Sequence, residues 1–330
     1  MNKKLIVACM FFSTLLLLAA CSNKATGNET EKDAAKSGQT EQDEKIIIDN
    51  NDFVIEYDKA PSRAISLNQH VTEIMLALGL EDSMVGTAYL DDKIYKPLQE
   101  TYEKVPVLAE QYPSKEQVIE AEADFLYAGW SSAFTEKSIA AREELKELGI
   151  DSYLQMSSTK VAPTLEDIYT DIRNIAKIFR IEDRGEELVS QMNQDIEEIT
   201  AKLPEVKEPL EVLVFDSGDT EVFTATQNFM NTLVTMAGGR NVFGDVEGNW
   251  ATVSKEDAVE RQPEVIVVID YGSTTVEQKI NFLKSDPALS ETPAVQNEKF
   301  VTLPLSAASE GIRAAEAVEI LAKGFYPDAY

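Results

Sequence analysis

Short apolar runs alternate along most of the chain with segments in which apolar residues recur three and four positions apart. The runs predict strands and the segments predict helices, among them 71–78 and 136–148, each followed by a glycine that suits a helix C-cap. Strands that alternate with helices are typical of parallel sheets covered by helices, so the pattern predicts an α/β fold. The predicted strands are Ala64–Leu67, Met84–Ala88, Phe125–Gly129, Ser152–Met156, Glu211–Phe215, Val265–Ile269 and Phe300–Leu303.

The alternation stops at residues 164–203, where two helical stripes follow each other without a strand between them. Thr164 is placed to cap the first stripe, and Pro204 ends the second. We therefore predict two α/β lobes with parallel sheets, at 46–163 and 204–330, joined by a long interdomain helix that limits their relative motion.

The start of the chain has the features of an export signal. Two lysines precede an uncharged apolar run, Leu5–Ala20, that is short for a helix spanning a bilayer. The run ends in Leu-Ala-Ala-Cys21, which matches a bacterial lipobox, in which the cysteine thiol receives a diacylglycerol. We predict a lipoprotein signal peptide at 1–20, lipid on Cys21 and a flexible, acidic tether over 21–45. The alternative is an uncleaved membrane anchor.

Charge and cysteine content exclude several classes of function. The formal net charge is −28, and loss of the signal peptide, which carries two lysines and no acid, makes it more negative. Such a surface repels phosphate backbones, so we expect no nucleic-acid partner. Cys9 is removed with the signal peptide and Cys21 carries the lipid, so the mature domain has no thiol for a disulfide or a cysteine metal site.

A segment of the first lobe occurs again in the second. Residues 114–126 and 254–266 both begin with Ser-Lys-Glu, carry a second glutamate four positions later and place an acid before an apolar strand. Glu116 and Glu256 therefore occupy equivalent places at the starts of two short helices. They either contact basic residues of a symmetric partner or only complement the helix dipoles. The dipole interaction stabilises each helix by about 0.3–1 kcal/mol.

Several segments together resemble the iron-siderophore and cobalamin periplasmic-binding family. The resemblance implies two Rossmann-like lobes, a rigid interdomain helix, a ligand cleft between the lobes, and contacts from Glu116 and Glu256 to arginines of a permease dimer. The segments that carry it are Pro61–Leu67, Thr72–Leu80, Val85–Thr87, Leu148–Ile150, Ala237–Phe243 and the second copy of the repeat, 254–266.

The resemblance also implies a function. We expect a monomeric solute-binding lipoprotein, anchored on the extracytoplasmic face of the cell membrane, that delivers a ferric-siderophore-type chelate to an ABC permease dimer with its ATPase. It has no intrinsic cofactor, and haem, a corrinoid and a metal ion are alternative ligands. The sequence lacks a phosphate-binding loop, a His-Glu-x-x-His motif and a Gly-x-Ser-x-Gly motif, so we expect no enzyme, although a catalytic carboxylate pair or a sensor lipoprotein stays open.

Aromatic residues lie where a ligand cleft is expected. Tyr89, Trp130 and Tyr271 each follow a predicted strand, and Trp250 precedes the second copy of the repeat. Loops at the carboxyl ends of parallel strands form the binding crevice of such folds. The four side chains suit a flat or apolar chelate, or alternatively pack the lobes.

Two further candidates are charged or ionisable. His70, the single histidine of the chain, follows the first predicted strand and is a ligand contact, a metal ligand or a structural residue. Arg313 starts the last helix and either meets an anionic chelate or pairs with Glu316.

Overall fold

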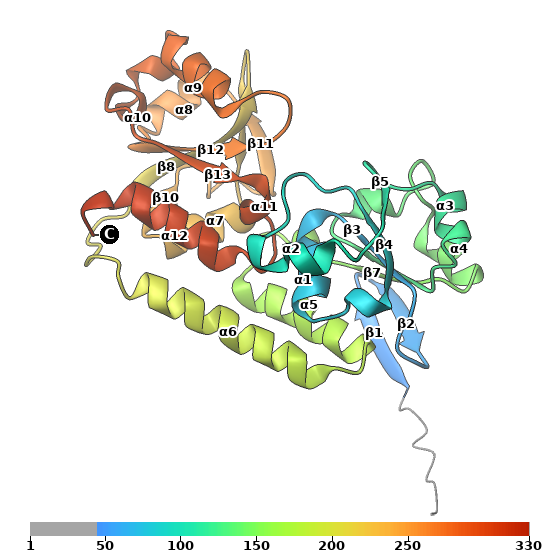
Figure 1. The fold of residues 1–330 in the computed structure, drawn as a ribbon. Helices are drawn as coiled ribbons and strands as arrows, with labels where there is room; N and C mark the ends of the chain where they lie inside the picture. The colour runs from blue at the N-terminus through green and yellow to red at the C-terminus, as the bar shows by residue number, and fades with distance from the viewer. Residues whose placement is uncertain (1–44, 330) are drawn as a thin grey trace, which may run out of the picture. The chain divides into compact units, whose positions relative to one another are not determined.

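The computed structural model describes residues 45–329, which belong to one compact unit. The predicted signal peptide, the predicted lipidation site at Cys21 and nearly all of the predicted tether lie outside the described residues. The unit contains two α/β lobes, each built around its own sheet (Figure 1).

An antiparallel hairpin that we did not predict precedes the first lobe. It consists of β1 (Ile46–Asn50) and β2 (Phe53–Tyr57), and burial alternates along β1. Asn51 and Asp52 form the two-residue turn, both with positive φ, as the favoured hairpin turn requires. The buried Asn50 side chain fastens the hairpin to the first lobe by donating to the Leu154 carbonyl over 2.8 Å.

The first lobe has a five-stranded sheet in the order β5-β4-β3-β6-β7, and all its pairs are parallel. Alternate residues face opposite sides: Phe125 and Tyr127 pack in one core cluster, whereas Leu126 and Ala128 pack in another. Helices α1 and α5 cover the first side, and α3 and α4 cover the second. The elements up to β7 are β3 (Ala64–Leu67), α1 (Gln69–Ala77), β4 (Met84–Ala88), α2 (Gln99–Tyr102), β5 (Val107–Ala109), α3 (Lys115–Glu120), β6 (Phe125–Ala128), α4 (Arg142–Glu147) and β7 (Asp151–Leu154).

The second lobe has a six-stranded sheet in the order β11-β9-β8-β12-β13, with β10 paired to β8. The two-lobed α/β prediction is confirmed, but this sheet is mixed: β9 and β11 run antiparallel because a tight turn at 219–221 folds β9 back on β8. Its elements are β8 (Leu210–Gly218), β9 (Val222–Ala225), α7 (Phe229–Met236), β10 (Gly239–Asn241), β11 (Trp250–Val253), α8 (Lys255–Glu260), β12 (Val265–Asp270), α9 (Val276–Ser285), α10 (Pro293–Gln296), β13 (Phe300–Pro304), α11 (Leu305–Ala308) and α12 (Ala314–Phe325).

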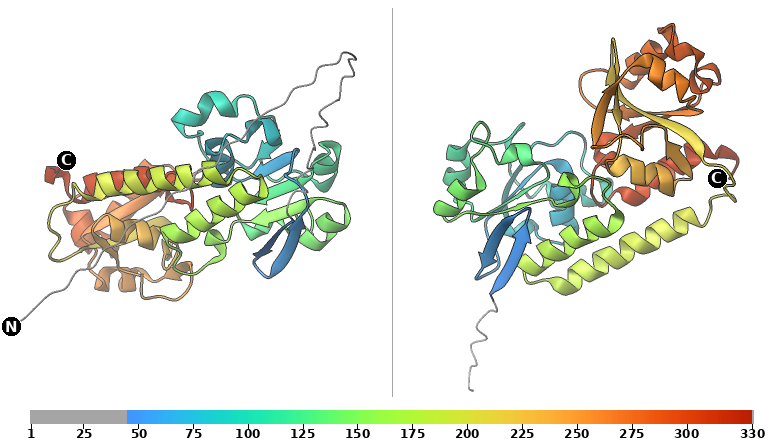
Figure 2. Two further views of the ribbon diagram at one scale, coloured as in Figure 1. Left: turned by 90° about the horizontal axis from the view of Figure 1, so that it is seen from below. Right: turned by 180° about the vertical axis from the view of Figure 1, so that it is seen from behind.

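The connection between the lobes is two helices rather than one. Helix α5 (Leu165–Ile178) begins with a capping box in which Asp167 accepts from the Thr164 amide over 2.7 Å. The chain then turns at Arg180, whose φ is 60°, and continues as α6 (Glu182–Thr200). Helix α6 packs against both α5 and α12 and so runs from one lobe to the other (Figures 1 and 2).

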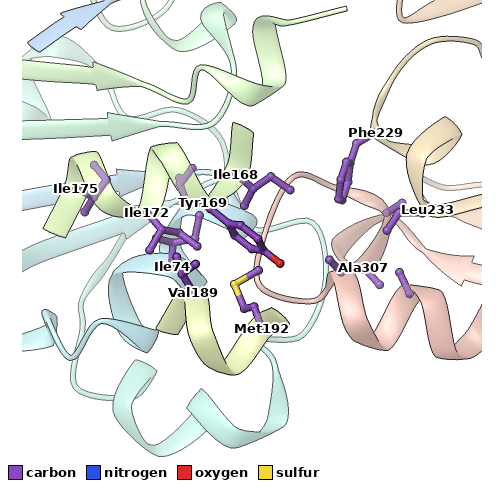
Figure 3. Close-up of a cluster of buried hydrophobic side chains, with 14 of the residues drawn as sticks. Ile74, Ile168, Tyr169, Ile172, Ile175, Val189, Met192, Phe229, Leu233 and Ala307 are labelled. Carbon is purple, nitrogen blue, oxygen red and sulfur yellow. The ribbon is translucent and has the colours of Figure 1, made fainter. Parts of the chain in front are cut away.

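One apolar core cluster includes side chains of both lobes. Ile168 and Tyr169 of α5 lie in it together with Phe229 of α7 and Ala307 of α11. Figure 3 shows these side chains between the two lobes, with Met192 of α6 beside Tyr169. Continuous packing of this kind opposes independent movement of the lobes, because interiors are close-packed and separating them exposes apolar surface.

Candidate ligand cleft

A pocket of about 240 Å³ is lined by residues of both lobes. The first lobe contributes Trp130, directly after Gly129 at the end of β6, and Ser158. The second lobe contributes the rest, from the start of β11, from α7 and from the segment around α11. These are Asn228, Phe229, Met230, Asn249, Trp250, Ile269, Leu305, Ala308, Ser309 and Glu310.

The two predicted tryptophans therefore line one pocket from opposite lobes. Trp250 is 39% exposed and stacks on Phe223, with ring centroids 5.2 Å apart and planes 13° apart. Trp130 is half-buried and contacts His70, with ring centroids also 5.2 Å apart. Each indole is thus held by an aromatic neighbour and presents its remaining surface to the pocket, an arrangement that suits an apolar or ring-containing ligand.

His70 lies behind Trp130 and is absent from the residues that line the pocket. Its side chain is 2% exposed and fits between two glycines: a Cβ at Gly129 would stand 2.3 Å from the imidazole, and one at Gly311 would stand 3.0 Å from the His70 Cβ. Burial lowers the pKa of His70 to about 4, so the imidazole is neutral, and its buried Nε2 has no hydrogen-bond partner. Within residues 45–329 no cluster of three or more His, Cys, Asp and Glu side chains is placed to hold a metal ion.

Arg313 is not free to meet an anionic chelate. Its Nε donates to Glu73 Oε2 over 2.8 Å and its Nη2 to Glu73 Oε1, across the two lobes. Nη2 also donates to the Lys93 carbonyl over 2.7 Å, and Nη1 donates to the Ser306 hydroxyl over 3.1 Å. The predicted partner Glu316 is 3.9 Å away, at the limit of an ion pair. The dominant partner, Glu73, is 240 positions distant in sequence.

Neither Tyr89 nor Tyr271, both predicted ligand contacts, lines the interlobe pocket. Tyr89 contacts Tyr112 edge-on at 4.7 Å between ring centroids. The pKa of Tyr271 is raised by burial first and then by the charges of Asp91, Tyr89 and Asp216, which brings groups of both lobes into one electrostatic neighbourhood. Burial, reinforced by Asp92, raises the pKa of Asp91 to about 6.

Tyr271 lines a second hollow, of about 280 Å³, at the carboxyl ends of β8 and β12. Asp216 and Lys279 lie in the same lining. Lys279 is buried, and its ammonium donates to the carbonyls of Ile269 and Tyr271 over 2.7 and 3.3 Å. Desolvation lowers the pKa of Lys279, and the nearby Asp216 opposes this shift.

Only the two tryptophans of the pocket lining were predicted from the sequence, and Glu310 is the one ionisable residue among the lining residues that were not. It follows α11 in the loop that precedes Arg313, and its backbone carbonyl accepts from Gln155 of the first lobe over 2.9 Å. Burial raises the pKa of the Glu310 carboxyl to about 7, with a further contribution from Asp171. Glu310 is separated from strand β13 by α11, so its position along the chain gave no clear signal.

The internal repeat is visible in the backbone. Ser114 and Ser254 each accept a capping hydrogen bond from an amide three residues later, at 3.3 and 3.0 Å. Helices α3 and α8 then have equal length, and each is followed by a residue with φ of 49°, Glu122 in one lobe and Gln262 in the other.

Matching ion pairs hold the two repeated helices. Lys115 pairs with Glu144 at 2.7 Å in the first lobe, and Lys255 pairs with Asp286 at 2.6 Å in the second. Glu116 and Glu256 are exposed in the first turns of these helices. Their contact with a permease stays a prediction. No helix within residues 45–329 has the length and apolar character needed to cross a membrane.

Three comparisons with known proteins agree with this architecture. A family model described as periplasmic binding protein matches residues 65–307. An uncharacterized ABC transporter substrate-binding lipoprotein of Bacillus subtilis is 29% identical over 322 residues, which cover 96% of each chain. A vitamin B12-binding protein of Pectobacterium atrosepticum is 27% identical over 63% of this chain and 71% of that protein. The crystal structure of a periplasmic binding protein from Veillonella parvula superposes with a TM-score of 0.79, at 29% identity, over 86% of this chain and 98% of that one.

Proposed function

We infer the function of this chain from one premise: it belongs to the periplasmic binding protein family. It is a solute-binding protein of an ABC transporter of the type that handles iron chelates, cobalamin or haem, and its role is binding and transport rather than catalysis. Such proteins act with a permease and an ATPase, outside the cytoplasm.

We propose that the ligand is a ferric-siderophore-type chelate held in the interlobe pocket. The observation that carries the proposal is the pair Trp130 and Trp250, one from each lobe, lining a single pocket. The pocket volume of about 240 Å³ lies at or below the lower end of the range for small-molecule sites, so a chelate would extend beyond it toward Tyr89 and Tyr271.

A corrinoid is the second candidate. It is favoured by the similarity to proteins named vitamin B12-binding proteins, which spans 63% of this chain for the Pectobacterium atrosepticum protein. A corrinoid ring is larger than the pocket and would rest across its mouth, again against the two tryptophans.

Delivery and anchoring complete the proposal. Glu116 and Glu256 would dock the two lobes on a permease dimer, and a lipid on Cys21 would hold the protein at the membrane surface. Two exposed acids at equivalent places of two similar lobes support the docking role. The similarity to a protein named a lipoprotein over 96% of the chain supports the anchor.

The proposal is tested by replacing the two tryptophans of the chain, both of which line this pocket. Native mass spectrometry of protein purified from its host identifies the ligand, and calorimetry then gives its affinity. We expect Trp130→Ala and Trp250→Ala each to weaken binding by tenfold or more, the cost of losing a central aromatic contact. Unchanged affinity in the double variant would remove this pocket from the proposal.

A further inference from the structure

The interlobe pocket has no basic side chain in its lining. Among the described residues that line it, the polar ones are Ser158, Asn228, Asn249, Ser309 and Glu310, and only the last is ionisable. A site built for an anionic ligand normally places Arg or Lys in its wall, because an anion that leaves water needs a compensating charge.

The basic residues close to this pocket are engaged elsewhere. The Arg313 guanidinium is buried and donates to Glu73, Ser306 and the Lys93 carbonyl. Lys160, two residues beyond Ser158, pairs with Asp167 at 2.5 Å. The neutral imidazole of His70 is covered by Trp130 and two glycines.

The acidic residues are differently placed. Within residues 45–329 the Glu310 carboxylate has no hydrogen bond or ion pair with another side chain, and it stands in the wall of a largely apolar pocket. Asp216 lines the separate pocket next to Tyr271 and is not part of this lining. Like charges repel more strongly at a partly desolvated site than in water, so an anionic ligand group would meet an unfavourable field here.

Building on the proposed function, we propose that Glu310 makes the pocket selective for a ligand whose inserted group is a cationic or neutral hydrogen-bond donor, such as an ammonium or an amide N–H, and that it rejects chelates that present carboxylates or catecholates. Glu310 supplies the acceptor and the tryptophans supply the apolar walls.

Burial and the charge of Asp171 raise the pKa of Glu310, although a hydrogen bond from its own backbone amide partly opposes this shift. A bound ammonium would compensate its charge and lower that pKa. A hydrogen bond in which one partner is ionised is roughly twice as strong as a neutral one. An ammonium adds the attraction of its opposite charge, which a neutral amide lacks, so this contact discriminates between the two ligands.

The experiment compares ligands that differ in charge. The probes are a ferric tris-hydroxamate with a free amine, the same chelate N-acetylated, a ferric tris-catecholate, haem and cyanocobalamin, titrated by calorimetry. We expect the wild-type chain to bind the amine-bearing chelate best, the acetylated chelate or cyanocobalamin more weakly, and the catecholate and haem at least about tenfold more weakly than the best probe.

The decisive variant is Glu310→Gln, which keeps the shape and the hydrogen-bonding oxygen but removes the charge. It should lose about tenfold in affinity for the amine-bearing chelate and less than about threefold for the acetylated one. Glu205→Gln, an exposed acid outside the pocket lining, serves as the matched control and should change neither. Thermal melting of the variants checks that each remains folded.

The outcomes separate the two proposals. Tight binding of the catecholate or haem, or an equal response of both hydroxamate probes to Glu310→Gln, overturns the inference and leaves the solute-binding function intact. If cyanocobalamin binds and neither hydroxamate does, the siderophore assignment is overturned. The proposed preference for cationic or neutral ligand groups then stands. Failure of all neutral and cationic probes to bind overturns both.

Discussion

Arg313 of the second lobe and Glu73 of the first form a buried, two-point ion pair. The two side chains are 8% and 1% exposed, and the Glu73 carboxylate also accepts from the Tyr95 amide over 2.9 Å. The pair joins α1 to the start of α12, so the two lobes are held by a charge contact as well as by the apolar core between them. A planar guanidinium suits a carboxylate in this geometry because it can donate two parallel hydrogen bonds.

Removing only the arginine should destabilise the chain strongly. In Arg313→Met the Glu73 carboxylate stays buried without its partner, which typically costs about 3–5 kcal/mol. The double variant Glu73→Leu with Arg313→Met removes both charges and should lose clearly less than Arg313→Met alone. Equilibrium urea unfolding measures both. Losses that simply add would contradict a coupled, buried pair.

The imidazole of His70 should not titrate in the folded chain at ordinary pH. Its pKa is lowered to about 4 by burial, and because the chain has one histidine, its ring proton signals in an NMR spectrum are assigned without ambiguity. We expect constant shifts between about pH 8 and pH 5.5, and a normal midpoint near about 6.5 in urea. A folded-state midpoint above pH 6 would place His70 in contact with solvent or with a negative charge.

The lowered pKa of His70 also makes the free energy of unfolding depend on pH. The folded chain binds fewer protons at His70 than the unfolded chain, so the free energy of unfolding falls as pH drops from about 6.5 toward about 4, by roughly 3 kcal/mol in total. The difference between wild type and His70→Gln across this range isolates the effect, because the buried carboxyls that titrate nearby are common to both chains. If the difference in the free energy of unfolding between the two chains does not change with pH, the lowered pKa of His70 is contradicted.

The docking role of the repeat glutamates has an internal control. Glu116→Ala with Glu256→Ala should leave ligand affinity and melting temperature nearly unchanged but strongly reduce uptake through the cognate importer, since rim charges act mainly on association. Glu120→Ala with Glu260→Ala removes the same charge from exposed positions one helical turn further along the same two helices. Normal uptake by the first pair at normal expression would assign Glu116 and Glu256 to their helix dipoles alone.

Lipid attachment is tested by labelling. Cys21→Ala should abolish incorporation of radiolabelled palmitate and leave an unprocessed precursor, because no other residue follows the apolar run in a lipobox. Cys9→Ala lies within the predicted signal peptide and should label normally. Equal labelling of the Cys21 variant would show that the anchor is elsewhere.

The regular alternation of strands and helices made the fold predictable. Elements outside that alternation and contacts between residues far apart in sequence could not be predicted. Strands β3 and β4 match their predicted bounds, and a polar residue directly precedes each run. Helix α4 is shorter than the predicted 136–148, since Ile139 and Ala140 are buried in an irregular segment rather than on a helix face. Strands β9 and β11 were not predicted, because they form the antiparallel part of the second sheet, which the alternation of strands and helices does not reveal.

The candidate site was predictable only where a place beside a predicted strand or the repeat indicates it. Trp130 was predicted from its place after β6, whereas Trp250 was predicted from its place before the second copy of the repeat, and both line the pocket. The role of Arg313 could not be predicted from the sequence. Its partner Glu73 is 240 positions away, and no local pattern distinguishes Glu73 from the other acidic residues. Glu310 was missed for a related reason: one carboxylate among 58 acidic residues is visible only when its surroundings are known.

The apolar cluster shared by the lobes also governs how the chain reaches its native state. Ile168 and Tyr169 of α5 are buried together with Phe229 and Ala307, which are synthesised later. A nascent chain that has completed the first sheet therefore still exposes this apolar face, and it cannot bury it until most of the second half has emerged. The lobes consequently mature together, and during that interval the face is a site for chaperone capture or for aggregation.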